Sequence, residues 1–312
     1  MEPEAPSQGA AFETCYRHPS EQTGVHCTRC NRPICPECMI PAPVGFQCPE
    51  CVADARKAFR QGPARRIRAA TVRRTSATLA TLLLLAAIFV VQLASGHGVG
   101  LGLTGQIDPL LRHGAVIPIA VADGQYYRLV TAMFLHFSVL HLLMNAWALW
   151  FFGQFIETSY GRSGFVVIFL VGGFCGSVAT YLFGPVIEVS AGASGAIFAL
   201  FGAFIAYNVR RRHSAMSRAN LQSAVFLILL NLFLTLGYSQ IDWRAHLGGI
   251  VGGFAVGGVI DWAASRPSRR GTAIAGVVGI LAIGVGLVVV RTAQLQAQFP
   301  GFLNELTRRL FS

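Results

Sequence analysis

Charged side chains are scarce in this sequence. Only 12% of its 312 residues are charged, whereas 53% are hydrophobic, and a soluble domain carries roughly 25% charged residues. So few charges cannot build a surface that faces water everywhere. Lipid must therefore cover part of the protein, which excludes a wholly soluble class.

Acidic residues are especially few, 14 against 25 basic ones, which leaves a net charge of +11 carried almost wholly by arginine. In a soluble protein such an excess would suggest a nucleic-acid partner. Here the arginines gather between apolar runs, in residues 56–74, 210–218 and 266–270, as the positive-inside rule describes. We therefore expect no nucleic acid and some attraction to anionic membrane lipids.

The first 55 residues lack the apolar run of a secretory signal peptide. We expect this segment to stay in the cytoplasm, so that the protein is a multi-pass protein of a bacterial plasma membrane with a cytoplasmic N-terminus. Cytoplasmic thiols stay reduced, which matters for the cysteines discussed below.

Seven apolar runs each come close to the ~20 residues that cross ~30 Å of hydrocarbon. They lie near residues 76–95, 131–154, 164–183, 193–209, 221–238, 244–264 and 272–290. Seven crossings from a cytoplasmic N-terminus place all three basic segments inside, so the predicted fold class is an all-α polytopic membrane protein. Residues 96–130 become an external loop, whose apolar stretch 117–121 is suited to the membrane interface.

Seven of the eight cysteines lie in residues 15–51, where four metal-binding pairs each span two intervening residues. The pairs are Cys15 with His18, Cys27 with Cys30, Cys35 with Cys38, and Cys48 with Cys51. Eight such ligands complete two tetrahedral zinc sites and leave no open position for catalysis. Disulfides are the alternative, disfavoured in the cytoplasm, and His26 is an alternative ligand. We predict two structural zinc ions, and no cofactor for catalysis.

The zinc-binding segment resembles a B-box or another small cross-brace zinc finger. That resemblance implies that the first and third pairs share one ion and the second and fourth pairs the other, a choice that spacing alone leaves open. A module of about 40 residues has too small a core to fold without metal.

Polar side chains interrupt three of the apolar runs, which is costly in a membrane and usually functional. His136, His141 and Asn145 lie in the second run, Ser194 opens the fourth, and His246 lies early in the sixth. Ser194 and His246 precede the inner charges of their helices, Arg210 and Asp261, by 16 and 15 residues. At 1.5 Å per residue both lie about 22–24 Å above those charges, and His141 lies equally far above Glu157.

This set of groups is suited to acyl transfer. Ser194 is a weak nucleophile unless a neighbouring base accepts its proton, and His246 can do so near neutral pH. His141, Asn145 and the Ser194 N–H can stabilise an oxyanion. Asp261 is a helix length away and Glu157 is expected to face the cytoplasm, so we predict a dyad without an acidic third member. Glycines such as Gly249 let the sixth helix approach its neighbours.

Each motif alone has a simpler explanation. A glycine-flanked serine at a helix start usually serves small-residue packing, and a lone intramembrane histidine is more often structural or a proton relay. A transporter or channel that uses the histidines is therefore one alternative function. We expect His136 to be structural and to brace the external loop.

Four stretches together closely resemble the rhomboid family of intramembrane proteases. They are Tyr126-Tyr-Arg-Leu-Val-Thr-Ala-Met-Phe-Leu-His136, His141-Leu-Leu-Met-Asn145, Gly192-Ala-Ser-Gly195 and Ala245-His-Leu-Gly-Gly-Ile-Val-Gly252. The resemblance implies a six-helix core with Ser194 as nucleophile and His246 as general base. It implies that His141 and Asn145, with Gly192 beside them, bind the oxyanion and substrate, and that Arg128 structures the first external loop.

Two positions depart from the family pattern. Some members carry a tyrosine four residues after the serine, against which the catalytic imidazole packs. Here that residue is Phe198, which keeps the ring. Tyr127 stands where a tryptophan is common.

The predicted organisation has five parts. These are a disordered tail (1–14), a zinc module (15–55), a basic linker (56–75), a six-helix protease core (76–264) and a seventh transmembrane helix with a tail (265–312). The predicted function is hydrolysis of peptide bonds in or near the transmembrane segments of membrane proteins. The alternative is a catalytically silent relative that binds membrane clients. The zinc module is expected to bind a cytosolic protein partner.

Overall fold

The computed structural model describes residues 12–42, 44–61, 75–95, 108–237, 241–264, 268 and 270–299, apart from the side chains of 58–61 and 231–237. The chain divides into two compact units, Met1–Arg73 and Arg74–Ser312. Most of the predicted tail and linker (1–11 and 62–74) and the C-terminal tail (300–312) lie outside the described residues.

The first unit is a small set of hairpins followed by a helix. Strand β1 (Glu13–Thr14) pairs antiparallel with β2 (Gln22–Thr23), and β3 (Ile40–Pro41) pairs antiparallel with β4 (Phe46–Gln47). A 3-10 helix, η1 (Pro36–Cys38), and helix α1 (Pro49–Gln61) complete it. Residues 13–14, placed in the predicted tail, form a strand, and residues 56–61, placed in the predicted linker, continue α1.

Hydrophobic side chains contribute little to the core of this unit. Its buried hydrophobic cluster consists of six cysteines and Ile34. Since so small an apolar core cannot offset the entropy of ordering the chain, the unit needs another source of stability.

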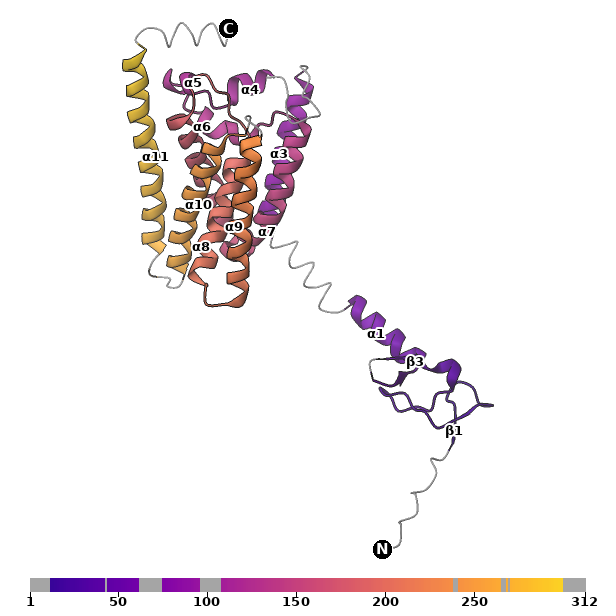
Figure 1. Cartoon of the computed structure of the whole chain (residues 1–312). Helices are drawn as coiled ribbons and strands as arrows, with labels where there is room; N and C mark the ends of the chain where they lie inside the picture. The colour runs from indigo at the N-terminus through magenta and orange to yellow at the C-terminus, as the bar shows by residue number, and fades with distance from the viewer. Residues whose placement is uncertain are drawn as a thin grey trace. The chain divides into compact units, whose positions relative to one another are not determined.

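The second unit is a bundle of helices that run side by side (Figure 1). Its elements are α3 (Ser76–Ala94), α4 (Pro109–Gly114), α5 (Pro118–Ala122), α6 (Arg128–Thr131), η2 (Ala132–Phe134), α7 (Val139–Phe183), α8 (Ser194–Arg210), α9 (Ala215–Gly237), α10 (Trp243–Ala264) and α11 (Arg270–Gln298). Within α7, Gly161 has φ 76° and ψ 174°, which breaks the helix into two spans. All seven predicted spans thus correspond to helices.

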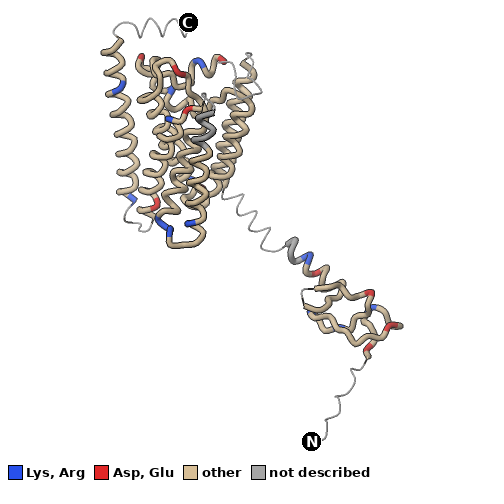
Figure 2. Tube along the Cα trace, in the orientation of Figure 1, with Lys and Arg blue, Asp and Glu red and all other residues tan. Residues whose placement is uncertain are grey.

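The bundle has the length and composition of a membrane protein. Among the described residues, α3, α7, α10 and α11 are long and apolar enough to cross a membrane, and α8 and α9 are shorter apolar helices. Charged residues gather at the two ends of the bundle, and few lie along the helices (Figure 2). This confirms the predicted all-α polytopic fold.

The second predicted span begins later than expected, at Val139 rather than 131. The hydroxyl of Ser138 caps this helix by accepting the N–H of His141 at 3.1 Å. The apolar residues before it form the short elements α6 and η2. His136 therefore lies in the loop before the helix, and not within the helix as predicted.

The stretch 117–121 was expected at the membrane interface, and this was wrong. Its residues are buried because α5 packs into a hydrophobic cluster with Tyr181 and Val288. Gln296 of α11 also donates to the carbonyl of Ala122 at 3.0 Å. The seventh helix thus covers this segment and removes it from lipid.

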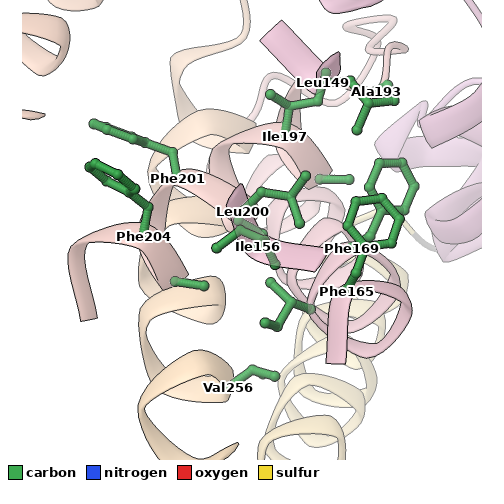
Figure 3. Close-up of a cluster of buried hydrophobic side chains, with 14 of the residues drawn as sticks. Leu149, Ile156, Phe165, Phe169, Ala193, Ile197, Leu200, Phe201, Phe204 and Val256 are labelled. Carbon is green, nitrogen blue, oxygen red and sulfur yellow. The ribbon is translucent and has the colours of Figure 1, made fainter. Parts of the chain in front are cut away.

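The main core lies where α7, α8 and α10 meet. Figure 3 shows side chains from these helices converging, with Ile197 of α8 beside Leu149 of α7 and Leu200 of α8 beside Ile156 of α7. This cluster includes Ala193, the residue that precedes α8. The core therefore anchors the start of α8.

Glu157 is buried, which corrects the prediction that it faces the cytoplasm. Its carboxylate accepts hydrogen bonds from the N–H groups of Ala77 and Thr78 at 2.9 and 2.8 Å and from the Thr78 hydroxyl at 2.8 Å. A carboxylate stabilises the positive end of a helix. Glu157 thus fixes the start of α3 to α7.

The C-terminal ends of α8 and α10 are joined by ion pairs. Arg210 and Arg211 contact the Asp261 carboxylate at 2.7 and 2.8 Å. Since Ser194 and His246 lie at similar distances along these helices from Arg210 and Asp261, this pairing agrees with the common depth predicted for them.

Candidate active site

Glycines allow α8 and α10 to touch backbone to backbone. A Cβ added at Gly249 would overlap the carbonyl oxygen of Gly195, and one added at Gly195 would lie 3.5 Å from the carbonyl oxygen of Ala245. Gly195 follows Ser194, and Ala245 precedes His246. The backbones of α8 and α10 therefore approach closely next to the two predicted dyad residues.

The ring of Phe198 holds the His246 imidazole. The two rings are stacked, with centroids 4.1 Å apart and planes at 21°, and His246 is only 8% exposed. Phe198 lies one turn after Ser194 on α8. The side chain of His246 is thus held against the same helix that begins with Ser194.

Ser194 is the first residue of α8 and is half-buried. The preceding Gly192 has φ 136°, a conformation that favours glycine, and its N–H donates to the carbonyl of Ala132 at 2.9 Å. This turn sets Ser194 at a helix N-terminus, where backbone N–H groups lack helical partners. Such groups can stabilise a negative charge near Ser194.

His141 and Asn145 lie beside this turn. A Cβ at Gly192 would lie 2.7 Å from Cε1 and 2.9 Å from Nε2 of the His141 ring, and 3.8 Å from Nδ2 of Asn145. The Asn145 amide donates to the His141 carbonyl at 3.0 Å, and a primary amide has a second N–H donor. The structure thus brings His141, Asn145 and Gly192 together, two residues before Ser194.

Arg128 and His136 lie in the adjoining loop region. Arg128 is fully buried, and its guanidinium donates to the carbonyls of Arg112 and Ala115, both at 2.9 Å. The His136 ring is also fully buried and contacts the His141 ring edge-on, with centroids 5.2 Å apart. The buried positions of Arg128 and His136 are those expected of residues that organise the loop region before α7.

Sequence reasoning overlooked Asp242, which precedes α10. Its carboxylate accepts hydrogen bonds from the hydroxyls of Thr180 and Ser190 and from two N–H groups at the start of α10. An aspartate four residues before His246 is a recognisable helix cap. No sequence pattern links it to Thr180, 62 residues away.

The first unit gathers its eight predicted ligands into two separate clusters. One contains Cys15, His18, Cys35 and Cys38, and the other contains Cys27, Cys30, Cys48 and Cys51. Within each cluster the ligand atoms lie within 4.8 Å of one another. This is the cross-brace arrangement in which the first and third pairs share one site, and each cluster has the composition to hold a metal ion. All eight cysteines of the chain are free thiols.

The distances fit a tetrahedral metal. The sulfur atoms of Cys30 and Cys48 are 3.7 Å apart, and Nδ1 of His18 lies 3.2 Å from the sulfur of Cys35. Bonds of zinc length would place two sulfurs about 3.8 Å apart and a nitrogen and a sulfur about 3.6 Å apart. His26 lies outside both clusters, with its ring 3.5 Å from Glu13.

Backbone hydrogen bonds prepare one thiol in each cluster for ionisation. Burial raises the pKa of Cys15, but N–H groups including that of Arg17 outweigh it and lower the pKa to about 6. The same balance, with the Cys48 N–H donating, lowers the pKa of Cys27 to about 6. Since the thiolate is the metal-binding form, one ligand in each cluster is ready to bind a cation. Burial instead raises the pKa of Cys38 to about 11, and the hydrogen bond to Cys48 raises the pKa of Cys51 to about 12.

Fold and site together define an integral membrane protein in which a serine at a helix start faces a helix that carries a buried histidine. The Rhomboid domain model matches residues 123–262. Rhomboid protease GluP of Bacillus subtilis is 33% identical over 181 residues, covering 58% of this chain and 35% of that protein. Putative rhomboid protease YdcA of the same organism is 32% identical over 136 residues, covering 44% of this chain and 68% of that protein.

Rhomboid-like protease 2 of Toxoplasma gondii is 31% identical over 173 residues, 55% of this chain and 60% of that protein. The chain belongs to the rhomboid family. The matches span about a third of GluP and about two thirds of YdcA, and the family model does not include the N-terminal unit.

Proposed function

We propose that this protein is an intramembrane serine endopeptidase that cleaves membrane proteins through a dyad of Ser194 and His246. The main support is the packing at the start of α8. There the carbonyl oxygen of Gly195 leaves no room for a side chain at Gly249 of α10, and Phe198 stacks on His246 with ring centroids 4.1 Å apart. Curated relatives named as rhomboid proteases support the same activity.

In the proposed mechanism, the Ser194 oxygen attacks the scissile carbonyl carbon while the His246 imidazole accepts its proton. The Ser194 N–H and the side chains of Asn145 and His141 donate to the oxyanion. The imidazolium then gives its proton to the leaving amine, which yields an ester on Ser194. Water attacks this ester with His246 again as base, which releases the second product and restores the hydroxyl.

The substrates are proposed to be transmembrane segments cleaved near the end of the bundle where α8 begins. A peptide carbonyl inside a helix is already hydrogen-bonded, so the segment must unwind before Ser194 can reach it. Residues that weaken helices, such as glycine, should therefore favour cleavage. The orientation that we propose, with a cytoplasmic N-terminus, places this end on the outer side of the membrane.

A cleavage assay in liposomes tests the proposal. The purified full-length protein is expected to cut a transmembrane substrate and to be labelled by a serine-directed fluorophosphonate, and Ser194→Ala should abolish both. Ser223→Ala is a matched control, since Ser223 is exposed on α9 and its hydroxyl donates to the Ala219 carbonyl within the same helix. Labelling that survives Ser194→Ala would refute the nucleophile assignment. A protein that binds the substrate without cutting it would be a catalytically silent relative.

We also propose that the N-terminal unit binds two structural zinc ions. Four ligands per cluster fill a tetrahedral shell and leave no position for a substrate, so catalysis does not use these ions. Metal analysis of the purified protein should give two zinc per chain, whereas Cys27→Ser should give one.

We further propose that this unit recruits a cytosolic protein and that basic segments contact anionic lipids. Deleting residues 1–55 should therefore change regulation or location and leave cleavage intact.

A further inference from the structure

Asp242 joins three segments of the chain that are far apart in sequence. Its Oδ2 accepts the hydroxyl of Thr180 at 2.5 Å and that of Ser190 at 2.6 Å. Its Oδ1 accepts the N–H groups of Arg244 and Ala245 at 3.1 and 3.2 Å. A carboxylate has about four acceptor positions, and these four donors fill them.

The joined segments are those that carry the proposed dyad. Ser190 lies four residues before Ser194, in the loop between α7 and α8, and His246 lies four residues after Asp242. Thr180, which is fully buried near the end of α7, provides a fixed reference for both. One carboxylate therefore links the loop before the serine, the helix of the histidine and the core.

A second contact joins the same loop to the same helix. Arg244 of α10 pairs with Glu188 of the loop at 3.0 Å. The loop is also tied on its other side, because Ser190 and Val116 exchange backbone hydrogen bonds at 2.8 and 2.9 Å. The side chain of Asp242 is only 12% exposed, and hydrogen bonds to a charged acceptor are about twice as strong as neutral ones.

We propose that Asp242 is a positioning residue for the dyad, whose carboxylate holds the loop that leads to Ser194 against the start of the helix that carries His246. This inference rests on the proposed protease function. Loss of the carboxylate removes the acceptor that joins the Ser190 hydroxyl to Thr180 and to two N–H groups of α10, so the loop and α10 are free to move apart. A misplacement of 1 Å can cost about 100-fold in rate.

The test compares variants of the full-length protein in liposomes by kcat, KM, fluorophosphonate labelling rate and thermal unfolding. We expect Asp242→Ala to lower kcat and the labelling rate about 100-fold per folded molecule with KM little changed. Asp242→Asn should recover part of this loss, since its amide oxygen can still cap α10 and its N–H can donate to Ser190. The matched control is Glu157→Gln, a buried capping carboxylate at the other end of the bundle, which should lower stability and leave kcat per folded molecule unchanged.

A double-mutant cycle isolates the key contact. Ser190→Ala should lower kcat by about 10-fold at most, and should have no further effect in the Asp242→Ala background, because the hydrogen bond is already lost. If the loss of kcat in the double variant equals the product of the losses in the two single variants, the proposal is overturned. An Asp242→Ala protein with the wild-type rate per folded molecule would overturn it as well. If Asp242→Ala does not fold, Ser190→Ala and Thr180→Val test the proposal instead, because both variants keep the Asp242 carboxylate. An unchanged kcat in both variants would overturn the proposal. A wild-type protein that neither cleaves nor is labelled would instead refute the protease function itself.

Discussion

Gly249→Ala tests the packing on which the proposed site depends. The new methyl group would overlap the carbonyl oxygen of Gly195 and would lie 3.1 Å from its carbonyl carbon and 3.3 Å from the N atom of Ala199. All three are backbone atoms of α8 and its start, so no side-chain rotation can relieve the contact. The two helices must separate.

The structure indicates how large the effect should be. The added Cβ would lie 2.1 Å from the Gly195 oxygen, so restoring an ordinary contact distance of about 3.5 Å requires a shift of about 1.4 Å between α8 and α10. Overpacking of this kind costs about 1–3 kcal/mol, which the better helix propensity of alanine offsets by up to about 1 kcal/mol. Because the shift acts one residue from Ser194 and three from His246, we expect kcat to fall about 100-fold.

Gly258→Ala provides the matched control on the same helix. A Cβ at Gly258 has no heavy atom within 4 Å, so this variant should keep wild-type cleavage and gain slightly in stability. Both variants would be compared by cleavage in liposomes, normalised to the folded fraction, and by thermal unfolding in detergent. A Gly249→Ala protein with wild-type stability and rate would refute the close approach of the two helices.

Three further predictions concern other contacts. Phe198→Tyr should keep cleavage because it keeps the ring, whereas Phe198→Ala should lower kcat about 2- to 10-fold because stacking contributes about 0.5–1.5 kcal/mol; equal rates in both would contradict the role of the stack. Arg128→Met should destabilise the loop by about 2 kcal/mol, since the buried carbonyl of Ala115 and the partly buried carbonyl of Arg112 lose their donor, and an unchanged unfolding temperature would argue against it. A strong chelator should unfold residues 15–55, seen as loss of protease resistance, while cleavage continues; loss of cleavage on chelation would contradict the assignment of a purely structural metal.

Local patterns were sufficient to predict the spans and the metal ligands. The length of an apolar run determines whether it crosses a membrane, and all seven predicted spans are helical. The spacing of two residues within each ligand pair is equally local, and all eight predicted ligands lie in the two clusters. The assignment of pairs to sites came from a resemblance, because spacing within a pair carries no information about distant pairs.

Helix boundaries were predicted less well. The second span begins at Val139 because Ser138 caps it, although the apolar run starts earlier. Such a boundary depends on one side chain competing with a continuous hydrophobic run. The capping role of Glu157 was also missed, because its donors lie 79 and 80 residues away in the chain.

Taken by itself, the sequence determined which segments enter the membrane, which residues can bind metal, and which serine and histidines are candidates for chemistry, since each of these follows from composition and short spacing. Only the tertiary structure decided that α5 is buried beneath α11 rather than exposed to lipid, and that Asp242 bonds to Thr180 and Ser190. These facts depend on contacts between segments far apart in the chain, and local periodicity does not encode which distant surfaces meet.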